Sequence, residues 1–232
     1  GTPHPATPSI GCYEYSASYV PTHRTIFVAT DGDDTADGRS KDTAFATVTN
    51  ALAHAQTGDT VYLSEGAYTN GVTLTIDKAI ALVGAGVDKT VLSPSAELIQ
   101  GIKMTAAGRI SKLTLTGFST HDTGSALYMS AGTADTIRVT ANWQRYISGV
   151  SSLNNCAGVY LKNGALLNSS IDHNQAKTGY GGTQGVGIYM ENGLVENCDV
   201  ADNSRNSGEF YGAGIRTSGG TIRNCRILRN VS

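Results

Sequence analysis

Four aspartates lie close together near the N-terminal end of the sequence, at Asp31, Asp33, Asp34 and Asp37. Carboxylate oxygens at alternate positions of a short loop are ligands that suit Ca²⁺. Read from Asp33, the loop partly matches the calcium loop of an EF-hand, but Ala44 stands where the closing Glu belongs. We predict a Ca²⁺ site at Asp31, Asp33 and Asp37. The alternative is a loop whose aspartates accept hydrogen bonds from their own backbone.

A second group of chemically competent side chains comprises the adjacent pair Asp172 and His173, with Arg138 upstream of them. A base and a carboxylate on one surface could move a proton of a bound substrate. These three residues are therefore our candidates for catalysis. The alternative is that they are solvated residues of a structural repeat.

Aromatic residues form a third group. Tyr128, Tyr160 and Tyr189, and then Arg216, each stand two positions after the start of a repeated segment. Aromatic faces next to polar groups suit sugar rings, and exposed patches often mark binding sites. The segments between repeats add further aromatic residues, namely Trp143, Tyr146, Tyr180, Phe210 and Tyr211. We predict glycan binding by an exposed strip and these loops. The alternative is a cross-strand ladder that stiffens a sheet.

The repeated segments are four copies of 17 residues without internal gaps. They read ALYMSAGTADTIRVTAN (126–142), GVYLKNGALLNSSIDHN (158–174), GIYMENGLVENCDVADN (187–203) and GIRTSGGTIRNCRILRN (214–230). A weaker copy starts at Gly101. The copies start 32, 29 and 27 residues apart (158 − 126, 187 − 158, 214 − 187), a period typical of solenoids, propellers and arrays. Apolar residues alternate within each copy, as in strands. Short strands and turns at this period predict a parallel β-helix with one copy per coil.

Stacked coils place equivalent residues about 4.8 Å apart. Cys198 and Cys225 then share an inward position on neighbouring coils. They are either two buried thiols or a disulfide, although side chains that point in the same direction have poor geometry for a disulfide. Asparagines close every copy, and stacked asparagines can hydrogen-bond along a turn; they are Asn142, Asn174, Asn203 and Asn230. At two outward positions, side chains of opposite charge lie on adjacent coils, namely Asp199 with Arg226 and Asp202 with Arg229. We expect exposed ion pairs there that contribute little to stability.

Composition excludes several classes of protein. Lys and Arg number 17 and Asp and Glu 19, a net charge of −2, without the basic face of a nucleic-acid binder. No apolar run approaches the roughly 18 residues of a membrane span, so we expect no membrane insertion. The four cysteines have no C-x-x-C spacing, which disfavours zinc.

Three regions follow from the pattern. Residues 1–24 are proline-rich and read as a linker or arm, residues 25–69 as an N-terminal cap, and residues 70–232 as coils. Within the cap we predict a strand at 25–30, an amphipathic helix at 44–56 that covers the end of the solenoid, and a strand at 60–63. Nothing comparable follows Asn230, so we expect further coils in the native protein, or end-to-end self-association of the isolated chain.

Residues 26–69 read IFVATDGDDTADGRSKDTAFATVTNALAHAQTGDTVYLSEGAYT. This tract resembles the opening of secreted bacterial right-handed parallel β-helix proteins of the pectin-lyase-like fold, and 72–91 resembles their first coils. Residues 9–15 resemble a segment with which such units end. The resemblance implies an all-β, right-handed parallel β-helix of about six or seven coils with an N-terminal cap helix. It implies an extracellular or cell-surface location.

The same group includes polysaccharide lyases, glycoside hydrolases and adhesins. Residues 170–173 resemble part of the W-I-D-H tract of pectate lyases but lack the Trp, and the Arg-x-Pro-x-x-Arg element is absent. The Gly-His-Gly element of polygalacturonases is also missing. We therefore predict a non-catalytic module that binds a polysaccharide or surface glycan. The alternatives are a fragment of a lyase or hydrolase, and a structural stalk.

Overall fold

The computed structural model describes residues 23–121, 124–145, 156–176, 185–205 and 212–231. The predictions for Tyr146, Tyr180, Phe210 and Tyr211, for residues 9–15 and for most of the N-terminal arm lie outside these residues. No helix in the described part is long and apolar enough to cross a membrane.

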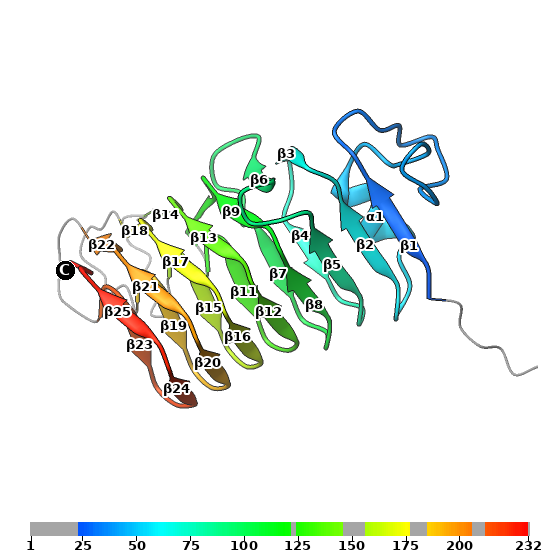
Figure 1. Cartoon of the computed structure of the whole chain (residues 1–232). Helices are drawn as coiled ribbons and strands as arrows, with labels where there is room; N and C mark the ends of the chain where they lie inside the picture. The colour runs from blue at the N-terminus through cyan, green and yellow to red at the C-terminus, as the bar shows by residue number, and fades with distance from the viewer. Residues whose placement is uncertain (1–22, 122–123, 146–155, 177–184, 206–211, 232) are drawn as a thin grey trace, which may run out of the picture.

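Four parallel sheets, here named A to D, make up the described chain (Figure 1). Sheet A contains β1 (Thr25–Val28), β2 (Thr60–Leu63), β5 (Ala81–Gly84), β8 (Arg109–Ser111), β12 (Thr133–Asp135), β16 (Ala165–Leu167), β20 (Leu194–Glu196) and β24 (Thr221–Arg223). Sheet B contains β3 (Gly66–Asn70), β6 (Thr90–Pro94), β9 (Thr114–Thr116), β13 (Arg138–Thr140), β17 (Ser170–Asp172), β21 (Asp199–Ala201) and β25 (Arg226–Leu228). Sheet C contains β4 (Leu74–Ile76), β7 (Ile102–Met104), β11 (Leu127–Met129), β15 (Val159–Leu161), β19 (Ile188–Met190) and β23 (Ile215–Thr217). The short sheet D contains β10 (Ser119–Thr120), β14 (Trp143–Gln144), β18 (Gln175–Ala176) and β22 (Ser204–Arg205).

The chain visits the sheets in a fixed order. It passes from sheet A to B to C, and from β8 onward it adds a strand of sheet D between B and C. Every pair of neighbouring strands is parallel, and each strand pairs with the equivalent strand one coil later. The fold is therefore the right-handed parallel β-helix that the sequence predicts. In the described residues sheet C has six strands, one per coil, and the solenoid has about five turns.

One corner of the coil differs from the prediction. The second alternating stretch of each copy forms the strand of sheet B, as Val139 does in β13, and a further strand of sheet A, such as β12, lies before it where only a turn was expected. From β8 onward, a residue with positive φ separates the sheet A strand from the sheet B strand of the coil, such as Thr136 (φ 55°), Asn168 (φ 49°) and Asn197 (φ 54°). The left-handed conformation turns the chain, and asparagine tolerates it well. The coil thus has three main sides.

In the described residues the interior is mainly apolar, and it contains a column of buried asparagines. Leu, Ile, Val and Met side chains from the three main sheets form one continuous core along the solenoid. At the corner between sheets B and D, Asn142 Nδ2 donates to Asn174 Oδ1 at 2.9 Å, and Asn174 Nδ2 donates to Asn203 Oδ1 at 2.9 Å. Asn203 Nδ2 donates to Asn230 Oδ1 at the same distance. This asparagine ladder confirms the structural interpretation of these residues.

Helix α1 (Val48–His54) packs at the N-terminal end, against β1 and the edge strand β4 (Figure 1). It is shorter than the predicted 44–56, because Thr47 caps its first turn and Ala55 is already extended. Asp34 accepts hydrogen bonds from the backbone N–H groups of Ala46 and Thr47, both at 2.9 Å, and so fixes the N-terminus. The predicted cap helix is therefore present.

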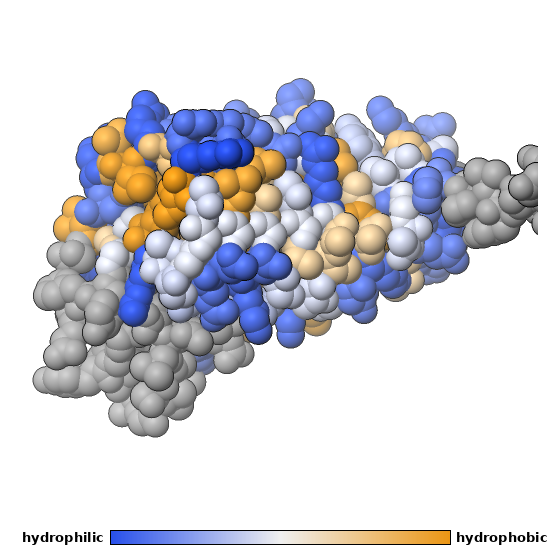
Figure 2. All heavy atoms as spheres, turned by 90° about the horizontal axis from the view of Figure 1, so that it is seen from below, coloured by the Kyte–Doolittle hydropathy of each residue, from blue (hydrophilic) through white to orange (hydrophobic). Residues whose placement is uncertain are grey.

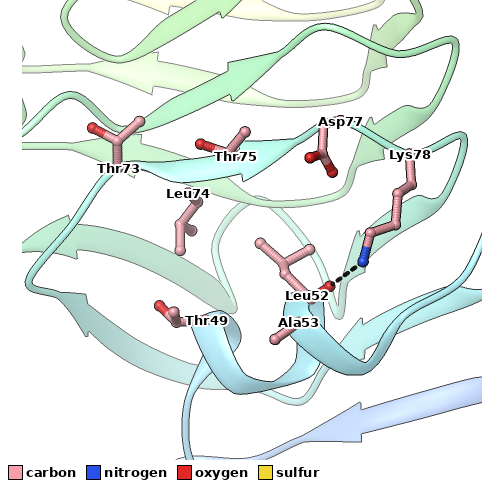
Figure 3. A pocket seen from close by; sticks show the side chains of 8 residues that line it. All are labelled: Thr49, Leu52, Ala53, Thr73, Leu74, Thr75, Asp77 and Lys78. Atoms are coloured by element: carbon pink, nitrogen blue, oxygen red, sulfur yellow. Dashed lines mark hydrogen bonds between the residues drawn. The ribbon is translucent and has the colours of Figure 1, made fainter.

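The C-terminal end of α1 is also fixed. Lys78 Nζ donates to the carbonyls of Leu52 at 3.2 Å and Ala55 at 2.8 Å, across a groove of about 270 Å³ between α1 and β4 (Figure 3). A cation at these carbonyls also complements the helix dipole. The groove is lined mainly by threonines and aliphatic side chains, and its lysine is engaged with the helix.

Candidate functional site

The three candidate catalytic residues meet on the outer face of sheet B. Arg138 donates from Nε to Asp172 Oδ2 and from Nη2 to Asp172 Oδ1, both at 3.0 Å. His173 Nδ1 lies 2.9 Å from Asp172 Oδ1. Thr140 Oγ1 at 2.6 Å and Ser170 Oγ at 2.8 Å donate to the same carboxylate. The sequence prediction thus selected three residues that are in direct contact.

Asp172 is saturated with hydrogen bonds, and its side chain is only 9 % exposed. Burial alone would raise the pKa of this carboxyl, but hydrogen bonds from Arg138, Thr140, His173 and Ser170 outweigh it and hold the pKa far below its usual range. Hydrogen bonding to Asp172 also raises the pKa of Arg138. A guanidinium base would need the opposite shift. The geometry therefore holds both side chains in their charged forms.

His173 is the accessible member of the cluster, with 61 % of its side chain exposed. It occupies the corner between sheets B and D, with a positive φ of 54° that Ala141 and Asp202 share at the same position of neighbouring coils. A neutral ring that donates from Nδ1 to Asp172 presents Nε2 to solvent as a hydrogen-bond acceptor.

Sheet D continues the surface beyond this corner. Trp143 pairs in register with Ser119 on one side and with Gln175 on the other. Trp143 and Gln175 are half-buried, whereas the following residues, Gln144 and Ala176, are buried on the opposite side of their strands. We name Arg138, Trp143, Asp172, His173 and Gln175 the corner surface. Sequence analysis selected all of these residues except Gln175, which the pairing of sheet D strands would have indicated.

The tyrosine row follows the predicted register but is not exposed. Tyr128, Tyr160, Tyr189 and Arg216 are successive partners on sheet C, yet Tyr160 is 3 % and Tyr189 is 7 % exposed. The prediction of an exposed strip is therefore wrong for its two central members. The centroids of the Tyr160 and Tyr189 rings lie 5.1 Å apart, and the Tyr160 hydroxyl donates to Glu191.

Cys156 explains part of this burial. It precedes β15 and packs with Tyr160 and Tyr189 in a small cluster on the outer side of sheet C, with the half-buried Tyr128 against it. Burial raises the pKa of Cys156 to about 12 and also raises that of Tyr160. The row thus forms a second, smaller core. Of its tyrosines, Tyr128 is the one that retains substantial exposure.

The aspartate loop uses its carboxylates locally. Asp33 Oδ1 accepts from Thr35 N and Thr35 Oγ1, both at 2.8 Å, and Asp37 Oδ1 accepts from Arg39 N at 3.0 Å and Thr43 Oγ1 at 2.7 Å. In the described part of the chain, no group of three or more His, Cys, Asp or Glu side chains is arranged to hold a metal ion. This geometry matches the alternative of self-satisfied turns, and Ca²⁺ binding at Asp31, Asp33 and Asp37 stays a prediction.

The predicted cross-coil ion pairs are present. Arg226 donates to Asp199 from Nε and from Nη2, both at 2.9 Å. Arg229 donates to Asp202 from Nε at 2.7 Å and from Nη2 at 2.6 Å. Arg223 adds a third pair with Glu196 at 2.9 Å between Nη2 and Oε2. All three join the same two coils.

Comparison with known proteins supports the fold. The structure resembles the pectin methylesterase PemA from Erwinia chrysanthemi, with a TM-score of 0.57 and 15 % identity over 90 % of this chain and 67 % of that one. A pectin methylesterase in complex with a hexasaccharide gives a TM-score of 0.56 at 16 % identity, with the same coverage of both chains. Pectate lyase Pel9A gives 0.52 at 16 % identity over 89 % of this chain and 63 % of its own, under two thirds of its length. No family model and no curated protein sequence matches the chain.

These likenesses define the class of protein. The chain is a right-handed parallel β-helix of the pectin-lyase-like fold. At such low identity the likeness establishes the architecture, and the chemistry of the site has to come from this chain's own residues.

Proposed function

We propose that this chain is a non-catalytic, glycan-binding β-helix module of a secreted or cell-surface protein, and that the corner surface contacts the glycan. The observation that carries the proposal is that the carboxylate of Asp172 is already fully hydrogen-bonded within the protein. Both of its oxygens already accept hydrogen bonds, including two from Arg138. A carboxylate in this state is a poor nucleophile, base or metal ligand, but it fixes its neighbours well.

The surface around this pair suits a saccharide. The indole of Trp143 offers an apolar face against which a sugar ring can pack, as aromatic side chains do in mixed polar and apolar sites. Gln175, beside it in the sheet, and the exposed ring of His173 offer hydrogen-bond partners for hydroxyl groups. The fold neighbours named above, pectin methylesterases and a pectate lyase, make a polysaccharide the first ligand to test.

A panel of acidic and neutral polysaccharides, with and without Ca²⁺, tests this proposal. Binding is followed by isothermal titration calorimetry, and lyase product by ultraviolet absorbance of unsaturated ends. We expect binding without product, and a loss of about tenfold in affinity for Trp143→Ala and His173→Ala. Lys103→Ala serves as the matched control, because Lys103 is exposed on sheet C away from the corner surface.

Other outcomes would replace the proposal. Ultraviolet-absorbing product that disappears in Arg138→Ala would favour the lyase fragment, and calcium dependence would direct attention to the aspartate loop. Neither binding nor product would favour a structural stalk. Equal binding by Trp143→Ala and by the native protein would place the ligand elsewhere on the molecule.

End-to-end self-association is a separate part of the proposal. Large apolar side chains are exposed in the last coil, at Ile227, Leu228 and Val231. On the face seen in Figure 2, apolar residues also gather in the left half, where Figure 1 places the C-terminal coils. Sedimentation velocity should show concentration-dependent dimers, and Leu228→Glu should reduce them. A strictly monomeric profile at high concentration would contradict self-association.

A further inference from the structure

Two cysteines stack on neighbouring coils directly before the strands of sheet B. Cys198 precedes Asp199 and Cys225 precedes Arg226, and these two strand residues are register partners. Equivalent positions of adjacent parallel strands lie about 4.8 Å apart, which falls within the Cα separation that a disulfide bridges. Cys198 is 1 % exposed, whereas Cys225 is half-buried. Both are thiols in this structure.

The hydrogen bonds of the two thiols show where they lie. Cys198 Sγ is 3.2 Å from the carbonyl of Glu196, within its own coil. Cys225 Sγ is 3.2 Å from the equivalent carbonyl of Arg223, and it is also 3.6 Å from the carbonyl of Val195. Val195 belongs to the coil of Cys198, so the Cys225 thiol lies toward its partner. The Cys198 thiol has the same orientation and lies 3.5 Å from the carbonyl of Leu166, in the coil before it. The Cys198 side chain therefore has to rotate toward Cys225 for the sulfurs to join.

The pair is open to a small reagent. A groove of about 430 Å³ runs along the corner between sheets A and B and is lined by both cysteines, together with Asn197, Asn224 and Arg226. Burial, with a smaller contribution from Cys225, raises the pKa of Cys198 to about 12. A reagent in the groove therefore meets Cys225 first, because Cys198 is buried and its raised pKa disfavours its thiolate.

We propose that Cys198 and Cys225 form a reversible disulfide that ties the last two coils together, by exchange with a low-molecular-weight disulfide such as oxidised glutathione. The Cys225 thiolate attacks one glutathione sulfur, forms a mixed disulfide and releases one glutathione thiolate. The Cys198 thiolate then attacks the Cys225 sulfur and releases the second. Two protein thiols and one glutathione disulfide give one protein disulfide and two glutathione thiols, which take up the two protons.

The bridge would reinforce a junction that already has three ion pairs. A covalent link between residues 198 and 225 restrains the unfolded chain between them, and this restraint favours the folded state. Cys156 does not compete, because it is fully buried with Tyr160 and Tyr189 on the outer side of sheet C. The inference does not depend on glycan binding.

The test uses the full chain with Cys12→Ser and Cys156→Ser, equilibrated at mildly alkaline pH with mixtures of reduced and oxidised glutathione. Trypsin cuts after Arg223 and Arg226, so mass spectrometry can detect the tripeptide 224–226 linked to the peptide that contains Cys198. We expect one intramolecular bridge per chain and a melting temperature about 5 °C higher, reversed by reductant. Free thiols, or a mixed disulfide that stays on Cys225 in fully oxidised glutathione, would overturn the proposal.

Ser169 provides matched controls, because it occupies the same position one coil before Cys198. The variant Ser169→Cys with Cys225→Ser again places two cysteines on adjacent coils, and we expect it to form a bridge. The variant Ser169→Cys with Cys198→Ser separates them by two coils, beyond the reach of a disulfide. Equal bridging in both variants would show that pairing does not depend on the stacked geometry, and would also overturn the proposal.

Discussion

Asp172 is held ionised by its hydrogen bonds, and this makes its contribution to stability depend on pH. Because its folded-state pKa is depressed, the contribution is fully present above the unfolded value of about 4 and is lost as the pH falls toward the folded value. We expect Asp172→Asn to lower the free energy of unfolding by about 2 kcal/mol at pH 7. Urea denaturation from pH 7 to pH 3 should show this difference shrink below about pH 4. A difference in unfolding free energy between the two proteins that stays constant from pH 7 to pH 3 would contradict a depressed pKa for Asp172.

The asparagine ladder gives a second prediction for a single residue. Asn174 Oδ1 accepts from both the backbone N–H and the side-chain amide of Asn142, at 3.1 and 2.9 Å, in a fully buried position. Asn174→Ala leaves these donors without an acceptor, so we expect a loss of about 3 kcal/mol by urea denaturation. Asn163→Ala is the control, because Asn163 lies at an exposed turn of the same coil, and its loss should be under about 1 kcal/mol. Similar losses for the two variants would contradict the role of the ladder.

The candidate site was predictable residue by residue, but its contacts were not. The 32-residue offset between the copies that start at 126 and 158 places Thr140 beside Asp172, and so brings Arg138 diagonally within reach. Burial of Tyr160 was missed for a different reason. Alternation predicts that its side chain points away from the core, but not that Cys156 and Tyr189 pack on that same outer side.

Helix α1 is short enough that its cap should matter. Thr47 accepts a hydrogen bond from the backbone N–H of Asn50 and also donates to Asp34 Oδ2 at 2.7 Å. We expect Thr47→Ala to cost about 1 kcal/mol by thermal or urea denaturation. Thr49→Ala, at an exposed position within the same helix, should be neutral or slightly stabilising. A larger loss of stability for Thr49→Ala than for Thr47→Ala would show that packing rather than capping fixes the helix.

The strands were predicted well because short apolar alternation recurs in register across the copies. The strands of sheet A that end at corner residues such as Thr136 and Asn168 were missed. Each of these corners is a single polar residue within an alternating run, and only the left-handed backbone conformation shows that it is a corner. The apolar residues at 45, 48, 52 and 55 predicted a longer helix, because spacing cannot show that Thr47 acts as a cap.

Over the whole molecule, a solenoid is stabilised by contacts between adjacent coils, so its ends can open separately from its middle. The last coil is joined to the previous one by the ion pairs of Arg223, Arg226 and Arg229. These side chains are more than half exposed, so salt should screen them. We expect amide exchange in β24 and β25 to accelerate about fivefold between low and 1 M salt, equivalent to about 1 kcal/mol.

Hydrogen-exchange mass spectrometry measures this effect, and β12 and β13 serve as the internal reference within the same protein. Replacing all three arginines with glutamine should abolish the salt dependence and leave exchange in the last coil fast under both conditions. Uniform acceleration in every coil would indicate a general salt effect rather than local opening.

From β11 onward, variation in length is confined to one corner of the coil. From the start of each sheet C strand to the end of the following sheet B strand, equivalent residues then pair without insertions, whereas the interval from sheet D back to sheet C differs between coils. Foreign peptides introduced in these intervals would recur once per coil. The chain is thus a natural scaffold for displaying rows of sequences, and it could be lengthened by duplicating a coil without redesigning its core.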